Sequence, residues 1–110
     1  MLKVAPSKEQ RLNVQFRVEP GCLGPNGDQH IEHFCEYAEE KFETLDSEVV
    51  AWKIIPRLDK SLPEVEYRVM GKKLLESQVD KYLEVCGVTL EELETHLHDK
   101  LVEVIIEYMN

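Results

Sequence analysis

A strict alternation of apolar and polar residues between positions 11 and 19 constrains the fold more than any other feature. The apolar members of this pattern are Leu12, Val14, Phe16 and Val18. Because successive side chains of a β-strand point to opposite faces, a period of two predicts a strand with one face on a core and one in water. Pro20-Gly21 ends this strand.

In the rest of the chain, the spacing of the apolar residues alternates between the period of a helix and the period of a strand. The predicted elements are a strand over 11–19, a helix over 28–44, strands over 48–57 and 64–70, and helices over 77–86 and 89–108. The predicted helix caps are Asp28, Ser77, the C-terminal Gly87, and a capping box of Thr89 and Glu92.

The order is therefore β-α-β-β-α-α, with a loop of about six residues between the second and third strands that suits a long hairpin. Three strands cannot close a barrel. We expect an α+β fold, with a small three-stranded, mostly antiparallel sheet and helices packed on one face.

Length and composition fit one soluble domain. The chain has 110 residues, of which 43% are apolar and 32% are charged. We expect residues 1–10 to be a flexible N-terminal tail and residues 11–110 to form a single α+β domain. No apolar run approaches the roughly 20 residues that span a bilayer. Three cysteines, an odd number without a CxxC spacing, indicate a reducing compartment, and we expect a cytoplasmic protein.

The chain is acidic, with 22 acidic and 13 basic residues and a formal net charge of -9. A field of this sign repels phosphate backbones and anionic lipids, so we expect neither nucleic acid nor a membrane as partner. It suits the surface of a basic protein partner.

The last predicted helix is apolar over more than one stripe. Val102, Ile106 and Met109 extend the apolar surface beyond the line of leucines that faces the core. Such a helix needs cover on two sides, and a small sheet has edges that must be paired or blunted. Both requirements predict a homodimer with these three residues in its interface. The alternative is that the helix lies deep between the sheet and the shorter helix.

A loop-to-helix junction supplies the candidates for ligand or metal binding. Cys22 lies in a glycine-rich loop before a predicted helix, and His30 and His33 stand three residues apart on that helix. A thiolate is stabilised at a helix start, and a Cys-His pair is a nucleophile and base. Zinc takes three or four ligands, however, and Cys35 and Cys86 lie on apolar stripes where cysteine acts as a small hydrophobe. We predict no metal, no cofactor and no catalytic residue.

Two motifs are reminiscent of nucleic-acid binding. The GxxG at 24–27 occurs in KH domains, but there the loop joins two helices. Residues 78–97 have the outline of a helix-turn-helix, but the would-be recognition helix begins Leu90-Glu91-Glu92 and would set carboxylates against phosphates. A turn and a helical hairpin are the better interpretations.

The stretch 37–45, YAEEKFETL, followed by two predicted strands, resembles ribosome-hibernation factors, which share a β-α-β-β opening and an EKFxxL helix end. The resemblance covers about a third of the chain and implies a fourth strand and a basic surface for ribosomal RNA. This sequence shows no clear fourth strand and is acidic. No functional residue is carried over.

The sequence thus favours a non-enzymatic cytoplasmic protein that acts by protein–protein contact or as a regulatory module. The alternative is a small-ligand-binding or metal-binding protein, or a minor enzyme, that uses Cys22, His30 and His33.

Overall fold

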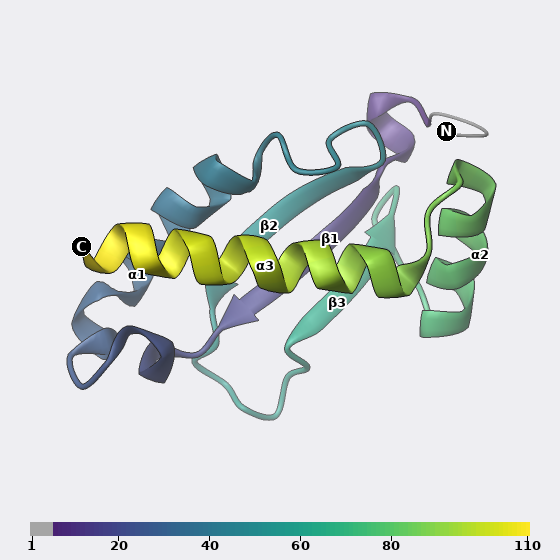
Figure 1. Ribbon diagram of the computed structural model, residues 1–110. Helices are drawn as coiled ribbons and strands as arrows, with labels where there is room; N and C mark the ends of the chain where they lie inside the picture. Colours follow the sequence, from purple (N-terminus) through teal and green to yellow (C-terminus); the bar gives the residue numbers. More distant parts are fainter. Residues whose placement is uncertain (1–5) are drawn as a thin grey trace.

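A computed structural model describes residues 6–110 of the chain (Figure 1). It contains a four-stranded sheet, and the alternating segment is the first strand along the chain and the second in the spatial order of the sheet. The elements are η1 (Lys8–Gln10), β1 (Leu12–Val18), η2 (Pro20–Leu23), α1 (Gly27–Phe42), β2 (Val50–Pro56), β3 (Val65–Val69), β4 (Lys72–Lys73), α2 (Glu76–Cys86) and α3 (Leu90–Met109). The fold class α+β is confirmed. Within the described residues, none of the helices combines the length and apolarity needed to cross a bilayer.

The strand pairing differs from the prediction. The sheet order is β2-β1-β3-β4, with β1 parallel to β2 and antiparallel to β3. The predicted count of three strands was therefore wrong, because the sheet has four strands, and the sheet is mixed, with two antiparallel pairings and one parallel pairing. The predicted hairpin between the second and third strands was also wrong. The connection after β2 instead carries the chain across to the far side of β1, where β3 pairs with it.

The fourth strand is only two residues long. Met70 and Gly71 both have positive φ angles, 51° and 79°, and they turn the chain so that β4 pairs with the end of β3. This is the backbone of a two-residue hairpin loop. A two-residue strand has no period for sequence analysis to detect, so the last predicted strand ended at residue 70.

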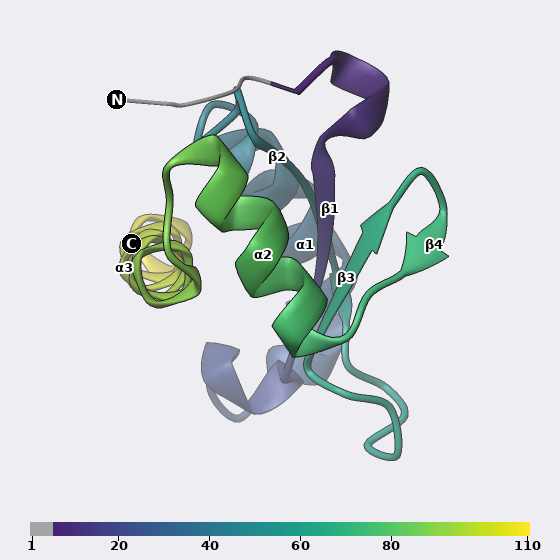
Figure 2. The same cartoon turned by 90° about the vertical axis from the view of Figure 1, so that its right-hand side faces the viewer.

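All three helices lie on one face of the sheet (Figure 2). The apolar side of β1 is buried at every position, as predicted. One core cluster joins the second half of β1 to α1 and the C-terminal half of α3. The other joins the first half of β1 and the start of β2 to α2 and the N-terminal part of α3. The predicted helical stripe of α1 is buried at Ile31, Phe34, Cys35, Ala38 and Phe42.

Two of the predicted helix caps were misplaced. The N-cap position of α1 is Asn26 rather than Asp28, and the N-cap of α2 is Leu75 rather than Ser77. Gln78 Oε1 accepts a hydrogen bond from the Leu75 amide at 2.7 Å, which is the half of a capping box that the third helical residue supplies. At the other end of α2, Gly87 adopts the predicted left-handed conformation, with φ 82°.

The predicted Thr89 cap of α3 is confirmed. Its hydroxyl oxygen accepts a hydrogen bond from the Glu92 amide at 3.1 Å.

The free edge of β2 is blunted within the chain. Glu39 Oε1 on α1 accepts a hydrogen bond from the Ile54 amide at 2.8 Å, and the Asp46 carbonyl accepts one from the Val50 amide at 2.9 Å. Pro56 has no amide proton to offer. The other outer strand, β4, is very short. Both are recognised ways to protect a sheet edge, so this fold needs no second copy to protect these two edges.

The predicted N-terminal tail, 1–10, is described only from residue 6. Residues 8–10 form the short turn η1, and Tyr82 on α2 donates a hydrogen bond from its hydroxyl to the Gln10 carbonyl at 2.6 Å. Residues 1–5 lie outside the described part of the chain, so the flexibility assigned to them stays a prediction.

Charge is divided between the two layers of the fold. The three helices hold 14 of the 22 acidic residues and 3 of the 13 basic ones. The charged residues of the four strands are five basic side chains and one acidic one, namely Arg17, Lys53, Arg68, Lys72, Lys73 and Glu66. The helical layer is therefore strongly acidic, whereas the sheet is basic, which the net charge alone does not reveal.

Candidate interaction surface on the last helix

The outward face of α3 carries the apolar stripe predicted for an interface. Val102, Ile106 and Met109 are 57%, 56% and 54% exposed, and their spacing of four and three residues places them on one side of the helix. The opposite side of α3 is buried through Leu97 and Val104. The alternative prediction, that α3 lies deep between the sheet and α2, is wrong for this face, because nothing in residues 6–110 covers it.

Carboxylates follow one flank of this stripe. Asp99, Glu103 and Glu107 line an open depression together with Val102 and Ile106. Lys100 Nζ lies 3.5 Å from Glu103 Oε2, so one of the three charges is partly balanced. The surface is therefore apolar along its centre and negative along one edge. We call Val102, Ile106 and Met109, with this acidic flank, the α3 outer face.

Among the candidate residues Cys22, His30 and His33, the structure gives a side-chain hydrogen bond only to His33. Cys22 is exposed in η2, and both histidines are exposed on α1. His33 Nδ1 is hydrogen-bonded to the Tyr108 hydroxyl at 2.8 Å, while no hydrogen bond joins Cys22 to either histidine. In the part of the chain that the structure describes, no group of three His, Cys, Asp or Glu side chains could hold a metal ion. His33 instead ties α1 to the C-terminal end of α3.

Two of the three thiols are buried and resist ionisation. Burial, reinforced by the negative charges of Glu39 and Glu32, raises the pKa of Cys35 to about 12. Burial also raises the pKa of Cys86. Because the thiolate is the nucleophile, neither group is chemically active near neutral pH.

We therefore expect one fast-reacting thiol per folded chain. At about pH 8 an aromatic disulfide reagent should modify Cys22 at least roughly tenfold faster than Cys35 or Cys86, because only Cys22 is exposed. Absorbance of the released thiolate follows the reaction, and the Cys22→Ser variant should lose the fast phase. Two or three fast thiols in the native protein would contradict the burial of Cys35 and Cys86.

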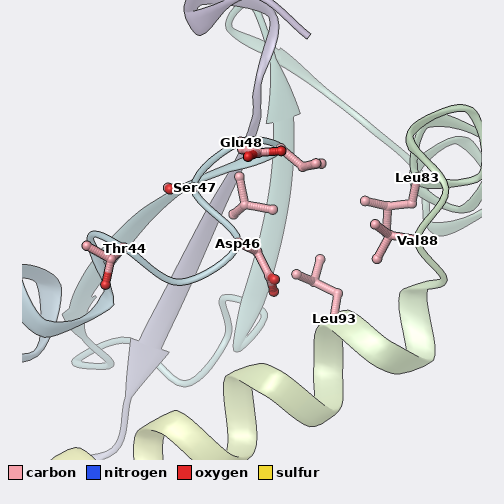
Figure 3. A pocket seen from close by; sticks show the side chains of 9 residues that line it. Thr44, Asp46, Ser47, Glu48, Leu83, Val88 and Leu93 are labelled. Carbon is pink, nitrogen blue, oxygen red and sulfur yellow. The ribbon is translucent and has the colours of Figure 1, made fainter. Parts of the chain in front are cut away.

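A cleft that sequence analysis missed lies between the α1–β2 loop and the α2–α3 hairpin (Figure 3). It has a volume of about 330 Å³, with an apolar side formed by Leu83, Val88 and Leu93. Asp46 lies in this loop and has a positive φ of 48°. Its Oδ2 atom lies 2.8 Å from Nδ1 of His96 on α3, at hydrogen-bond distance. The pair links residues that are 50 positions apart, so no local pattern signals it.

The Asp46–His96 pair orients an imidazole, as in hydrolases, but it lacks the third member of a catalytic set. Figure 3 shows Ser47 and Thr44 on the side of the loop that faces away from Leu83, Val88 and Leu93. No hydrogen bond joins either hydroxyl to His96. A nucleophile must lie within hydrogen-bond reach of its base. The pair is therefore suited to fastening the loop to α3.

Comparisons of the chain with models of protein families, with curated proteins and with solved structures find no match. The resemblance to ribosome-hibernation factors therefore finds no support in these comparisons. No function is taken from that resemblance.

Proposed function

We propose that this protein is a non-catalytic cytoplasmic binding module whose α3 outer face docks a basic, amphipathic segment of a partner protein. The observation that carries the proposal is the row of Val102, Ile106 and Met109, each more than half exposed on a helix whose opposite side is packed into the core. Contiguous apolar surface with a polar rim is typical of interaction sites. The three free cysteines support a reducing compartment.

The negative charge of the α3 outer face favours a partner segment with positively charged side chains. Asp99, Glu103 and Glu107 along the apolar row favour lysine or arginine side chains on the segment that binds there. An amphipathic helix fits such a surface, with apolar residues every three or four positions laid against the row. The helical layer as a whole is acidic, which speeds the approach of a basic segment from a distance.

A second copy of the chain is the other candidate occupant, because the same exposed row would be covered in a homodimer. Charge is less favourable there. In an antiparallel two-fold pairing of α3, the acidic flank of one copy lies beside the same flank of the other, and like charges repel. The sheet edges also give little support, since β2 is already blunted by Glu39 and Pro56.

The alternative of a ligand-binding or metal-binding protein or a minor enzyme, built on Cys22, His30 and His33, has less support. The nitrogen of His33 that is hydrogen-bonded to Tyr108 is already engaged in holding the helices together.

The test uses a matched pair of substitutions. Val102 and Val85 are 57% and 56% exposed, on α3 and α2 respectively. The probe is a synthetic 18-residue peptide in which leucine recurs at helical spacing and lysine fills the other positions, and binding is followed by chemical shifts of the backbone amides. We expect saturable binding with shifts along residues 98–110, and we expect Val102→Glu to weaken it at least roughly tenfold. Val85→Glu should leave it unchanged.

Sedimentation of the free protein separates the two occupants. A monomer that binds the basic peptide supports the proposal as stated. A dimer that Val102→Glu dissociates and Val85→Glu does not would assign the surface to a second copy. A monomer that ignores the peptide, or a peptide whose affinity both variants reduce equally, would overturn the proposal.

A further inference from the structure

A second apolar depression is lined by Val69 and Met70 of the β3–β4 hairpin, by Tyr82, Val85 and Cys86 of α2, and by Pro6 and Gln10 of the N-terminal segment, and it has a volume of about 330 Å³. The helix α2 and the hairpin lie at the other end of the molecule from the C-terminus of α3 (Figures 1 and 2). The Tyr82 hydroxyl is bound to the Gln10 carbonyl, so the polar end of this side chain is satisfied and its ring can face an apolar ligand. We call this depression the hairpin groove.

The hairpin next to the groove keeps large apolar side chains in water. Met70 and Leu75 are 69% and 70% exposed, more than any residue of the α3 outer face. Met70 also has a φ of 51°, a conformation that side chains other than Asn, Asp and Gly seldom adopt. A residue that is both strained and exposed contributes little to folding. This combination points to a role in binding.

The same hairpin is basic. Residues 68–75, RVMGKKLL, contain three basic side chains and no acidic one. Lys72 pairs with Val69 across the hairpin and so shares the face of the groove, whereas Lys73 pairs with Arg68 on the opposite face. Arg68 is already engaged by Glu66 at 3.0 Å. Lys81 lies one helical turn before Val85 on α2, and no residue that lines the groove is acidic.

We infer that the hairpin groove docks a short, extended, acidic and apolar segment of a partner protein. One apolar side chain of that segment fills the groove against Tyr82 and Val85, and a neighbouring carboxylate meets Lys72. The outer strand β4 is only two residues long, so its edge can pair with no more than a short stretch of extended backbone beside the groove. This site differs in place and in charge from the α3 outer face, so the two surfaces together describe an adaptor for one basic and one acidic partner.

The shape and charge of the molecule favour a peptide over other polyanions. A groove of this size accepts one side chain, whereas a bilayer is too flat to fill it. A nucleic acid extends beyond the hairpin, where the net charge of -9 and the acidic helices oppose it. Glu84 lies beside Val85 on α2, so the basic side of the site is the hairpin, where Lys72 meets the segment.

The probe for this site is an eight-residue peptide with blocked ends in which glutamate and leucine alternate. We expect saturable chemical-shift changes confined to Val69–Leu75 and to α2 from Tyr82 to Cys86. Lys72→Glu should weaken binding roughly tenfold. Lys73→Glu, which makes the same charge change on the other face of the hairpin, should change the affinity by less than about twofold. Val85→Glu should abolish binding, and Val102→Glu should not affect it.

Several results would overturn the inference. These are the absence of saturable binding, an equal loss of affinity in Lys72→Glu and Lys73→Glu, or equal binding of a peptide in which lysine replaces glutamate. Tighter binding to phosphatidylserine vesicles or to an RNA oligonucleotide, with loss in the same Lys72→Glu variant, would assign the hairpin to a membrane or to nucleic acid instead. Because Val102→Glu is silent in this assay, failure here is distinguishable from failure of the proposed α3 surface.

Discussion

Gly27→Ala is expected to lower the free energy of unfolding by about 3 kcal/mol, because the glycine lies where the start of α1 touches the turn η2. A Cβ atom at position 27 would overlap the carbonyl oxygen of Pro20 and come within 2.7 Å of its carbonyl carbon. Both atoms belong to the backbone, so no side-chain rotation relieves the overlap. Denaturation in guanidinium chloride, followed by far-ultraviolet circular dichroism, measures the change.

Gly21→Ala is the matched control. Gly21 lies in the same turn, and a Cβ there meets nothing within 4 Å. We expect its unfolding free energy to stay within about 0.5 kcal/mol of the wild type. If the two variants were equally stable, η2 and α1 would not be in the close contact seen here.

Most helices and strands could be predicted because their signals are local. The alternation of β1 and the helical stripes of α1 and α3 each lie within one element, and burial follows them closely. Which strands pair with one another could not be predicted from such local signals. β3 shows the same alternation whether it pairs with β2 or with β1, and the eight-residue connection before it permits both arrangements. The mixed sheet therefore depends on contacts between distant segments that a single sequence does not display.

The candidate sites also differ in whether their signal lies within one element or comes from distant segments. The α3 outer face was predicted because Val102, Ile106 and Met109 fall on one side of a single helix. The hairpin groove was missed because its walls come from three separate segments, namely the N-terminal segment, the β3–β4 turn and α2. His33 was considered for its neighbours in sequence, Cys22 and His30, but its partner in space is Tyr108, 75 positions away.

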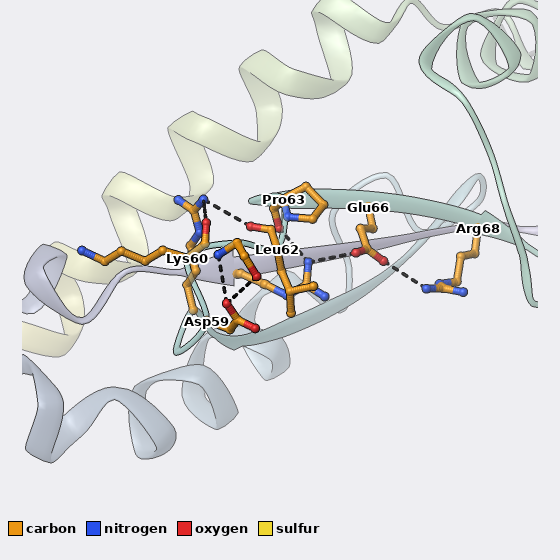
Figure 4. A network of polar contacts seen from close by, with 9 residues as sticks. Asp59, Lys60, Leu62, Pro63, Glu66 and Arg68 are labelled. Atoms are coloured by element: carbon orange, nitrogen blue, oxygen red, sulfur yellow. Dashed lines mark hydrogen bonds and ion pairs between the residues drawn. The ribbon is translucent and has the colours of Figure 1, made fainter.

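Arg17 is the clearest case of a side chain that the sequence pattern misplaces. The alternation of β1 assigns it to the water-facing side of the sheet, yet it is only 7% exposed. The connection between β2 and β3 folds over it, and its Nη1 donates to the Pro63 carbonyl at 2.6 Å and to Glu66 Oε1 at 3.1 Å (Figure 4). Glu66, itself only 6% exposed, is bound by Arg68 through its other oxygen.

Replacing Arg17 by methionine is therefore expected to lower the free energy of unfolding by about 3–5 kcal/mol. The substitution keeps most of the apolar stem but leaves the Glu66 carboxylate buried with one partner, and leaves the Pro63 carbonyl without its donor. Urea denaturation measures the loss. The double variant Arg17→Met, Glu66→Met should be more stable than Arg17→Met alone, since it no longer buries an unmatched charge. A double variant that loses the sum of two large single effects would show that the ion pair is not the cause.

The pH dependence of the same variants tests the electrostatic origin of the effect. Burial raises the pKa of Glu66, but hydrogen bonds from Arg68 and Arg17 and the positive charge of Arg17 more than offset it, so the pKa is lowered from 4.5. A lowered pKa in the folded state stabilises the protein above the unfolded value, and this contribution is lost as the pH falls through the folded value. Without Arg17, the pKa of Glu66 in the folded state should lie above its wild-type value, because a hydrogen bond and a positive charge that lower it are gone. The stability gap between wild type and Arg17→Met should therefore be full at neutral pH and should narrow as the pH falls from the folded pKa of the variant to the lower folded pKa of the wild type, whereas a gap caused by lost packing alone would not change with pH.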